Sequence, residues 1–304
     1  MLVTGGAGFI GSHLTERLVR DGHEVVVIDN MSTGRRQNLQ GVLHSRAVRL
    51  IKGDIRHRPT VSSAMRKVDA VTHLAAVISV PYSVSHPDIT NQVNVAGTLN
   101  LLDIACRRGV SGFVNISSCA IYGEAKYLPI DEDHPKSPLS PYAASKLCAE
   151  TYCEEFNRTQ GLPTTTLRLF NVYGPRQERN PYAGVMVQFR ERLRSRKPLM
   201  IYGDGKQTRD FVHVHDVVDA ICASLESKRA RGKAYNIGSG QATSVEALAG
   251  LMLKVSRMEA QPVHSASRSG DILHSQADIR RAREELGYEP KVSLEEGLRD
   301  LLED

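Results

Sequence analysis

The stretch MLVTGGAGFIG (residues 1–11) places Gly5, Gly8 and Gly11 directly after a short β-forming run and before a helical one. Gly5 allows a sharp turn out of the strand, and Gly8 removes a Cβ where a pyrophosphate must approach the backbone. Gly11 lets the helix pack closely on the strand. The helix expected over residues 11–21 directs free N–H groups and the positive end of its dipole toward that diphosphate. The pattern predicts a dinucleotide-binding turn.

A second strand follows this helix and ends in an acid, in the sequence VVVID (25–29). The Asp29 carboxylate at that position can accept hydrogen bonds from the adenosine ribose hydroxyls and would repel a 2′-phosphate. A glycine-rich turn alone is more often just a turn, so this context is what favours NAD over NADP. The chain begins only a few residues before the turn, which predicts a short first strand and leaves a start further upstream as an open alternative.

The bulk composition is that of a soluble globular protein. With 304 residues, 41% of them hydrophobic, the chain can bury a full core as one large or two modest domains. The net charge of +5 is spread out, and its densest run, RERLRSRK (190–197), is interpreted as a solvated helix face rather than a nucleic-acid patch. Five cysteines without a CxxC pair indicate reduced thiols and a cytoplasmic protein. We expect no membrane segment, no nucleic-acid partner and no metal site.

Short β-branched runs alternate with amphipathic stretches through the first 170 residues. Strand candidates lie at residues 2–4, 24–28, 47–52, 70–74, 112–117 and 164–170, and helix candidates at 12–21, 59–67, 90–108 and 141–159. This spacing predicts an α/β fold with a doubly wound parallel sheet whose ligands bind at the carboxyl ends of the strands.

After Phe170, glycine-, proline- and aromatic-containing turns interrupt shorter helices, as in an irregular lobe that closes over a substrate. A strand at 211–214, a helix at 216–225 and a strand at 234–237 are expected to return to the sheet, whereas helices at 244–255 and 278–286 are assigned to the lobe. We therefore predict a nucleotide-binding domain of residues 1–170 plus about 211–237, and a smaller α/β substrate lobe of about 171–210 and 238–304.

The pattern Tyr-x-x-x-Lys occurs three times, at positions 122/126, 142/146 and 202/206. Only Tyr142 and Lys146 lie at the start of a clear helix, PYAASKLCAETYCEEF, where the i, i+4 spacing places both side chains on one face. The other two pairs straddle turns that contain glycine. Tyr142 and Lys146 are therefore the candidate catalytic pair, although without the nucleotide turn a surface tyrosine and lysine would be the better interpretation.

Several motifs taken together resemble a known family. They are GGAGFIG, IDNMSTG with Asp29, Asp54–Ile55, Leu74–Ala76, Asn94, SSCAIYG, SPYAASK, FNVYGPRQ, GDGKQTRDFVHVHD, YNIGSG and GDILHSQADI. The chain resembles an extended short-chain dehydrogenase/reductase with a Rossmann fold, in the NAD-dependent nucleotide-sugar epimerase/dehydratase group, from residue 1 to about residue 298. Within that group it is similar to the UDP-glucose and UDP-N-acetylglucosamine 4-epimerases.

The resemblance implies a reaction by transient oxidation with a tightly bound NAD. Tyr142 as phenolate takes the proton of the sugar 4-hydroxyl through Ser118, the C4 hydride moves to NAD⁺, and the 4-keto sugar turns and receives the hydride on its other face. Lowering a tyrosine pKa of about 10 by roughly 3 units requires about 4 kcal/mol of differential stabilisation. Lys146 and the positive nicotinamide ring can both supply it, and Lys146 also holds the nicotinamide ribose.

The family's binding residues carry over by position. The implied cofactor contacts are Gly5, Gly8, Phe9, Ile10, Gly11, Asp29, Asn30, Ser32, Thr33, Gly34, Asp54, Ile55, Leu74, Ala75, Ala76, Asn94, Ser117, Tyr142, Lys146 and Phe170. The implied contacts to a UDP-sugar are Val80, Ser118, Tyr142, Asn171, Val185, Tyr202, Arg209, Arg268, Asp271 and Ser275. Asn171, Arg209 and Arg268 would bind the diphosphate. Arg209 could instead pair with Asp210, and Arg268 could be exposed to solvent.

Specificity is inferred from two places. Dehydratases and decarboxylases of the group carry acids directly after the catalytic serine or threonine, whereas this chain has Cys119 and Ala120, of which Cys119 is taken as a small core residue. Ser275 is small where epimerases restricted to plain hexoses have a tyrosine, so room for an N-acetyl group is expected. A dehydratase, decarboxylase, 4-ketoreductase or non-catalytic dinucleotide sensor remains an alternative, and dTDP- or GDP-sugars stay open. The family also implies a homodimer through helices 90–108 and 141–159.

Overall fold

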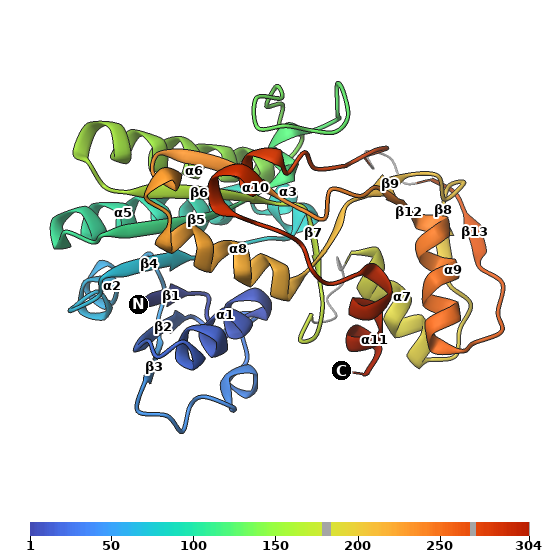
Figure 1. The fold of residues 1–304 in the computed structure, drawn as a ribbon, viewed down its shortest axis with the longest axis horizontal. Coiled ribbons are helices and arrows are strands. Elements are labelled where there is room, and N and C mark those ends of the chain that lie inside the picture. The colour runs from blue at the N-terminus through green and yellow to red at the C-terminus, as the bar shows by residue number, and fades with distance from the viewer. Residues whose placement is uncertain (178–183, 268–271, 304) are drawn as a thin grey trace.

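The computed structural model describes residues 1–177, 184–267 and 272–303. Its centre is a seven-stranded parallel sheet in the order β11-β6-β5-β4-β1-β2-β3 (Figure 1). The strands are β1 (Leu2–Thr4), β2 (Val25–Asp29), β3 (Val48–Lys52), β4 (Ala70–His73), β5 (Gly112–Ser118), β6 (Thr164–Leu169) and β11 (Lys233–Ile237). The predicted doubly wound α/β fold is confirmed. The strand order reverses between β1 and β4, where such sheets bind their ligands.

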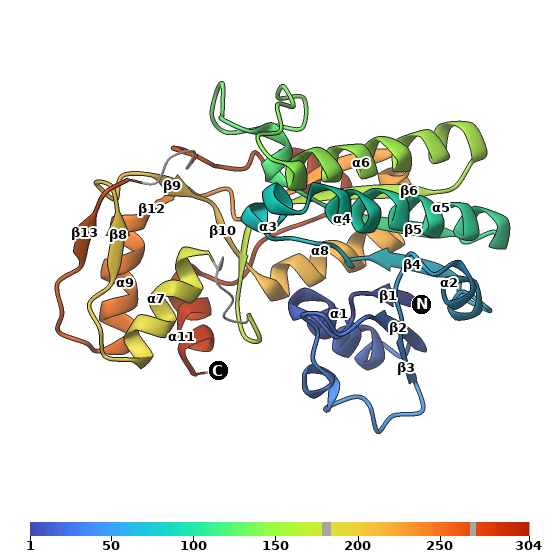
Figure 2. The ribbon, with the colours of Figure 1, turned by 180° about the vertical axis from the view of Figure 1, so that it is seen from behind.

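Helices cover both faces of this sheet. One face carries α2 (Arg58–Ala64), α5 (Gly97–Arg108) and α6 (Pro141–Gln160), which bury Val61, Leu101 and Cys153 in one core cluster. The other face carries α1 (Phe9–Arg20), α8 (Val214–Glu226) and α10 (Arg280–Leu286) over a second cluster. Figure 2 shows the molecule from behind, with α5 and α6 on one side of the strands and α1 on the other.

A third apolar cluster forms the core of a smaller region beside the sheet. It joins α7 (Val185–Arg194), α9 (Val245–Ser256) and α11 (Leu294–Glu303). Three two-stranded sheets accompany them: β7 (Asn171–Tyr173) with β10 (Phe211–His213), β8 (Met200–Tyr202) with β13 (Val263–Ser265), and β9 (Thr208–Arg209) with β12 (Thr243–Ser244). In Figure 1 this region lies at one end of the molecule, next to the C-terminus. The division of the chain into two domains stays a prediction.

Most expected helix and strand bounds agree with the structure to within three residues, but three features differ. The helix expected at 90–108 is divided into α4 (Pro87–Asn91), a π-helical turn (Gln92–Ala96) and α5. The strand at 211–214 does not return to the main sheet, because β10 pairs with β7 instead. Only β11 joins the main sheet, beside β6.

The third difference concerns the basic run at 190–197, which is not simply a solvated helix face. The Arg190 residue is only 4% exposed and Leu193 only 6%. Arg190 donates a hydrogen bond to the Gln177 carbonyl at 2.7 Å, so this guanidinium is internal to the smaller region. The helix ends at Arg194, before the run is complete.

Candidate active site

Two adjoining cavities lie at the carboxyl ends of the central strands. One of about 200 Å³ follows the nucleotide turn past Asp29 and Ala75, and the other, of about 360 Å³, reaches Ser118 and Tyr142. Phe9, Ile10, Leu74 and Ile78 line both, so the two cavities adjoin at these four residues. A ligand lying in both would extend from the adenosine side of the turn to the hydroxyl of Tyr142.

The glycine turn has the shape that a diphosphate needs. Gly5 has φ +70°, and a Cβ there would lie 2.8 Å from the Ala75 nitrogen. A Cβ on Gly11 would lie 2.2 Å from the Gly5 carbonyl oxygen, so the close packing of the turn on α1 requires glycine. A Cβ on Gly8 would approach only that same carbonyl, at 3.2 Å, and would otherwise project into open space. The turn therefore leaves room at the N-terminus of α1 for an anion.

Asp29 stands at the end of β2 and shapes the adenosine side of the cavity. Its Oδ2 accepts a hydrogen bond from the Ala7 nitrogen at 3.0 Å and its Oδ1 one from the Met31 nitrogen at 2.8 Å. A Cβ on Gly34 would lie 2.6 Å from Oδ2, so glycine at this position leaves room for the Asp29 carboxylate. A carboxylate has about four lone-pair sites, so acceptors remain for ribose hydroxyls. Asp54 also lines this cavity and pairs with Arg56, which lowers its pKa.

The nucleotide-side residues fit NAD. Most of the implied cofactor contacts line the smaller cavity: Gly5, Gly8, Phe9, Ile10, Gly11, Asp29, Asn30, Ser32, Thr33, Asp54, Ile55, Leu74, Ala75 and Ala76. Four others line the larger cavity, namely Ser117, Tyr142, Lys146 and Phe170. Gly34 and Asn94 line neither. Asn94 is 2% exposed and holds the loop after β4, since its Oδ1 accepts from the Val77 nitrogen at 2.7 Å and its Nδ2 donates to the Val77 carbonyl at 2.9 Å.

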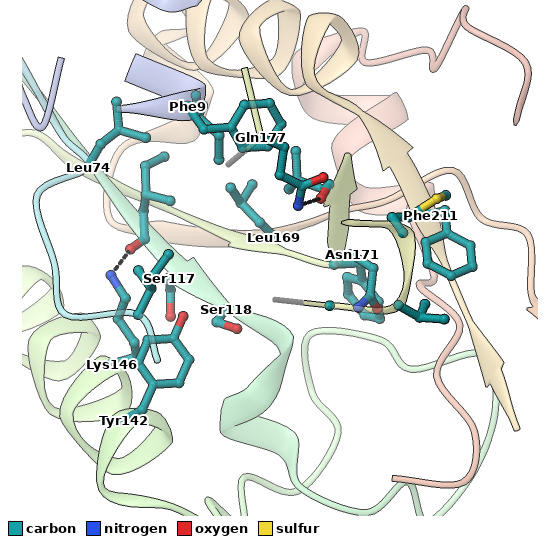
Figure 3. A pocket seen from close by; sticks show the side chains of 18 residues that line it. Phe9, Leu74, Ser117, Ser118, Tyr142, Lys146, Leu169, Asn171, Gln177 and Phe211 are labelled. Atoms are coloured by element: carbon teal, nitrogen blue, oxygen red, sulfur yellow. Dashed lines mark hydrogen bonds between the residues drawn. The ribbon is translucent and has the colours of Figure 1, made fainter. Parts of the chain in front are cut away.

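Ser118, Tyr142 and Lys146 converge on the larger cavity, as Figure 3 shows. Ser118 is the last residue of β5. Tyr142 and Lys146 lie one turn apart on α6, which begins at Pro141 because Ser140 caps it with a 3.1 Å bond from the Ala143 nitrogen. The Lys146 ammonium donates to the Ile116 carbonyl at 2.7 Å. This anchor fixes the lysine under the cavity.

Burial, rather than a neighbouring charge, dominates the titration of this cluster. It raises the pKa of Tyr142 to about 12, which a hydrogen bond with Ser118 partly offsets. It also lowers the pKa of Lys146 to about 8. The sequence led us to expect a tyrosine with a lowered pKa. The protein alone shifts it the other way, because water is excluded from the phenol and the Lys146 charge is itself costly to bury.

The larger cavity contains no acid among the residues that the structure describes. Cys119, directly after Ser118, packs against the core, and burial raises the pKa of its thiol to about 12. Such a thiol stays protonated at neutral pH, so Cys119 supplies neither a base nor an acid of useful strength. The polar groups that line the described cavity are hydroxyls, amides and one amine.

The predicted substrate residues divide into three groups. Asn171 and Val185 line the larger cavity. Val80, Tyr202, Arg209 and Ser275 are not among its lining residues: the Val80 residue is 43% exposed, and Ser275 is buried, at 5% exposed. Arg268 and Asp271 lie outside the described residues. The alternative pairing of Arg209 with Asp210 does not occur in the described part of the chain, where the buried Asp210 carboxylate accepts hydrogen bonds from Ser239, Gly240 and Ala277.

Sequence reasoning missed Gln177, Met186, Phe211 and Ile78 as lining residues. Gln177 is the polar one among them. Its Nε2 donates to the Val172 carbonyl at 3.1 Å, and its buried Oε1 has no hydrogen-bond partner among the described residues. In Figure 3 its amide lies across the cavity from Tyr142. The motif FNVYGPRQ ends on this residue and was the signal that could have indicated it.

The described residues also set two limits. In ranges 1–177, 184–267 and 272–303, no helix is both long and apolar enough to cross a membrane. Over the same ranges, no cluster of three or more His, Cys, Asp or Glu side chains could hold a metal ion.

Comparison with known proteins places this geometry in a family. Residues 1–238 match the NAD dependent epimerase/dehydratase family. A UDP-glucose 4-epimerase of Mycolicibacterium smegmatis is 40% identical over 304 residues, which cover 99% of this chain and 97% of that protein. The Thermotoga maritima UDP-glucose 4-epimerase, solved with UDP-glucose, has a TM-score of 0.94 at 40% identity and covers 99% of this chain and 97% of its own.

Other relatives broaden the picture. A UDP-N-acetylglucosamine 4-epimerase of Methanobrevibacter ruminantium has a TM-score of 0.95 at 35% identity, covering 99% of this chain and 96% of its own. A dTDP-glucose 4,6-dehydratase of Streptomyces venezuelae, solved with NAD, has a TM-score of 0.92 at 34% identity, covering 99% and 95%. A UDP-glucuronic acid decarboxylase of Xenopus tropicalis is 34% identical over 98% of this chain and 70% of that protein.

The motifs, the sheet and the two joined cavities agree with these comparisons. The chain therefore belongs to the NAD-dependent epimerase/dehydratase family, with NAD as its cofactor and isomerase as its enzyme class.

Proposed function

We propose that the protein is a UDP-hexose 4-epimerase that interconverts UDP-glucose and UDP-galactose, and also UDP-N-acetylglucosamine and UDP-N-acetylgalactosamine. The observation that carries this proposal is the larger cavity: it brings Ser118, Tyr142 and Lys146 next to the nucleotide turn and contains no carboxylate among its described residues. Dehydration and decarboxylation in this family are expected to need acids beside the reacting sugar. Epimerisation at C4 needs only a proton acceptor and a hydride acceptor.

The chain's own residues would then act on one hydroxyl. Ser118 holds the sugar 4-hydroxyl and passes its proton to Tyr142, which lines the same cavity. Lys146, anchored on the Ile116 carbonyl, favours the phenolate form of Tyr142 by its charge. NAD, which the glycine turn and Asp29 would hold in the smaller cavity, would supply the hydride acceptor for C4. The apolar walls at Phe9, Leu74 and Phe211 exclude water from the keto sugar.

Acceptance of the acetylated sugars rests on two supports. Ser275 is a small, buried side chain where epimerases restricted to plain hexoses are expected to have a tyrosine. The chain also shares 35% identity with a UDP-N-acetylglucosamine 4-epimerase over 99% of its length. Asn171, Tyr202, Arg209, Arg268 and Asp271 remain proposed contacts to the nucleotide part of the substrate.

The test is an incubation of the purified protein, without added cofactor, with UDP-galactose and UDP-N-acetylgalactosamine in separate tubes. Proton NMR of the products is expected to show the gluco epimers of both. Tyr142→Phe serves as the control for adventitious activity and is expected to form neither. Appearance of a 4-keto-6-deoxy sugar would replace the proposal with a dehydratase, and loss of CO₂ from UDP-glucuronic acid would replace it with a decarboxylase.

We further propose that the protein is a cytoplasmic homodimer formed through α5 and α6. Both helices lie side by side on one face of the sheet (Figure 2), and the Tyr152 residue on α6 is 36% exposed. Sedimentation velocity at micromolar concentration is expected to give twice the 33.5 kDa of one chain. A species of one chain's mass, in which Tyr152→Glu has no effect, would contradict this assembly.

A further inference from the structure

A network of buried hydrogen bonds joins β1, the strand before the nucleotide turn, to helix α5 on one face of the sheet. His73, at the end of β4, lies between Thr4 on β1 and Thr98 on α5. Its Nδ1 is 2.8 Å from the Thr4 Oγ1 and its Nε2 is 2.9 Å from the Thr98 Oγ1. All three residues are at most 3% exposed. No water is needed to satisfy either ring nitrogen.

The partners of the two hydroxyls fix which ring nitrogen carries the proton. The Thr98 hydroxyl donates its only proton to the Asn94 carbonyl at 2.6 Å, so it accepts from His73 Nε2–H. A neutral imidazole then has a bare Nδ1, which accepts from the Thr4 hydroxyl. The Thr4 oxygen is in turn free to accept the Ala75 N–H at 3.2 Å. Each donor in this hydrogen-bond network therefore has an acceptor, and this holds only when His73 is neutral.

The same chain continues from Asn94 to the turn of α6 that carries Tyr142. The Asn94 amide nitrogen donates to the Ser145 Oγ at 2.9 Å, and the Ser145 hydroxyl donates to the Tyr142 carbonyl at 2.7 Å. Asn94 also holds both backbone groups of Val77. Ala75 and Val77 line the dinucleotide cavity, whereas Tyr142 lines the larger one. This hydrogen-bond network thus links the walls of both cavities through His73.

We propose that His73 is a positioning residue, which sets the loop over residues 75–77 and the first turn of α6 in mutual register through Thr4 and Thr98. This inference rests on the proposed 4-epimerase function. Protonation of His73 would add a second N–H facing Thr4, whose hydroxyl would then lose its acceptor. Burial lowers the pKa of His73 to about 3, and the nearby Lys146 charge contributes in the same direction, so the neutral form is maintained at neutral pH.

The test uses threonine variants that keep the volume but lose the hydroxyl. Thr98→Val, purified as the NAD-loaded enzyme and assayed far below its melting temperature, is expected to lose about tenfold in kcat, equivalent to about 1.4 kcal/mol, because the first turn of α6 and residues 75–77 lose their common register. Its KM for UDP-galactose is expected to stay within about twofold, and the NAD retained per chain after dialysis is expected to fall. Thr98→Ser should restore both kcat and retained NAD.

Thr72→Val is the matched control on the neighbouring position of β4. The buried Thr72 hydroxyl has no partner among the described residues, so its removal should leave kcat and retained NAD unchanged. If Thr98→Val lowers the melting temperature but changes neither kcat nor retained NAD, the chain is merely structural and the proposal is overturned. If Thr98→Val does not fold, Thr4→Val tests the other ring nitrogen by the same readouts. An inactive wild-type enzyme would refute the proposed function. The amount of NAD retained by Thr98→Val, compared with the wild type, would still test the role of the hydrogen-bond network.

Discussion

At the scale of single residues, the site presents a tyrosine whose surroundings oppose its proposed role. Burial holds the pKa of Tyr142 near 12 when only the protein's own groups act on it. A base that works near neutral pH therefore depends on positive charge arriving beside the phenol. Lys146 is the protein's contribution, and its pKa of about 8 means that it carries that charge most fully below pH 8.

Lys146→Met tests this contribution through the pH dependence of kcat. The rate should rise with pH as Tyr142 loses its proton, and removal of the lysine charge should move that rise upward by about one pH unit or more. At a fixed pH on the rising limb, the variant should be at least about tenfold slower than the wild type. Lys126→Met, which alters one of the other Tyr-x-x-x-Lys pairs, is the control. An unshifted limb in Lys146→Met would contradict the role given to its charge.

Ser275→Tyr tests the proposed room for an acetamido group. Ser275 is only 5% exposed, so a tyrosine in this position cannot be accommodated without displacing neighbouring groups, and the proposed function places the acetamido group among them. We expect turnover of UDP-N-acetylgalactosamine to fall at least about tenfold and turnover of UDP-galactose to change by less than about threefold. Ser275→Ala should retain both. An equal loss on both sugars would show that Ser275 does not set this specificity.

At the scale of elements, helix α6, which carries Tyr142 and Lys146, is joined to the sheet by a buried ion pair. Glu150 on α6 and Arg168 on β6 are 5% and 2% exposed, and Arg168 also donates to the Tyr122 hydroxyl and the Glu132 carbonyl, both at 2.8 Å. Arg168→Met is expected to lower the free energy of unfolding by about 3–5 kcal/mol, because the buried Glu150 charge would keep only the Ser117 hydroxyl, at 3.2 Å, and the ammonium of Lys136, at 3.5 Å, as partners among the described residues.

Denaturant unfolding of three variants would test this ion pair. Arg168→Met with Glu150→Leu should recover part of the loss, because no unpaired charge remains. Arg158→Met removes an exposed pair with Glu155 on the same helix and should change the stability by less than about 1 kcal/mol. Equal effects of Arg158→Met and Arg168→Met would contradict the buried role of Arg168.

The junction of β1, β4 and α5 makes stability depend on acid. The folded pKa of His73 is about 3, below its unfolded value, so the unfolded chain binds the proton first as pH falls. Its contribution is fully present above about pH 6.5 and is lost as pH falls toward 3. Between pH 6.5 and pH 5 we expect a loss of roughly 2 kcal/mol, visible by urea unfolding. Over the same pH range, the free energy of unfolding of His73→Asn should fall by roughly 2 kcal/mol less than that of the wild type. The same dependence on pH in both proteins would contradict the assignment to His73.

At the scale of the whole molecule, local patterns predicted what local physics decides. The cap at Ser140 and the glycine at Gly161 bound α6 almost where the sequence placed it, and Gly5, Gly8 and Gly11 indicated the nucleotide turn. The sequence could not show that β10 pairs with β7, that Arg190 turns inward, or that Ser275 is buried without lining the larger cavity, since each depends on how the smaller region packs. Gln177 ends the motif FNVYGPRQ, but its place on the cavity wall and the missing partner of its buried oxygen among the described residues depend on the fold.

The proposed reaction inverts C4 by removing its hydrogen as a hydride and returning the same hydride to the opposite face of the sugar. The most direct test is to run the wild-type reaction on UDP-galactose in D₂O and to read the C4 position of the product by proton NMR. We expect a UDP-glucose product that keeps its C4 hydrogen fully, because the transferred hydride never exchanges with solvent. Deuterium at C4 would contradict it, since only removal of that hydrogen as a proton could introduce the label.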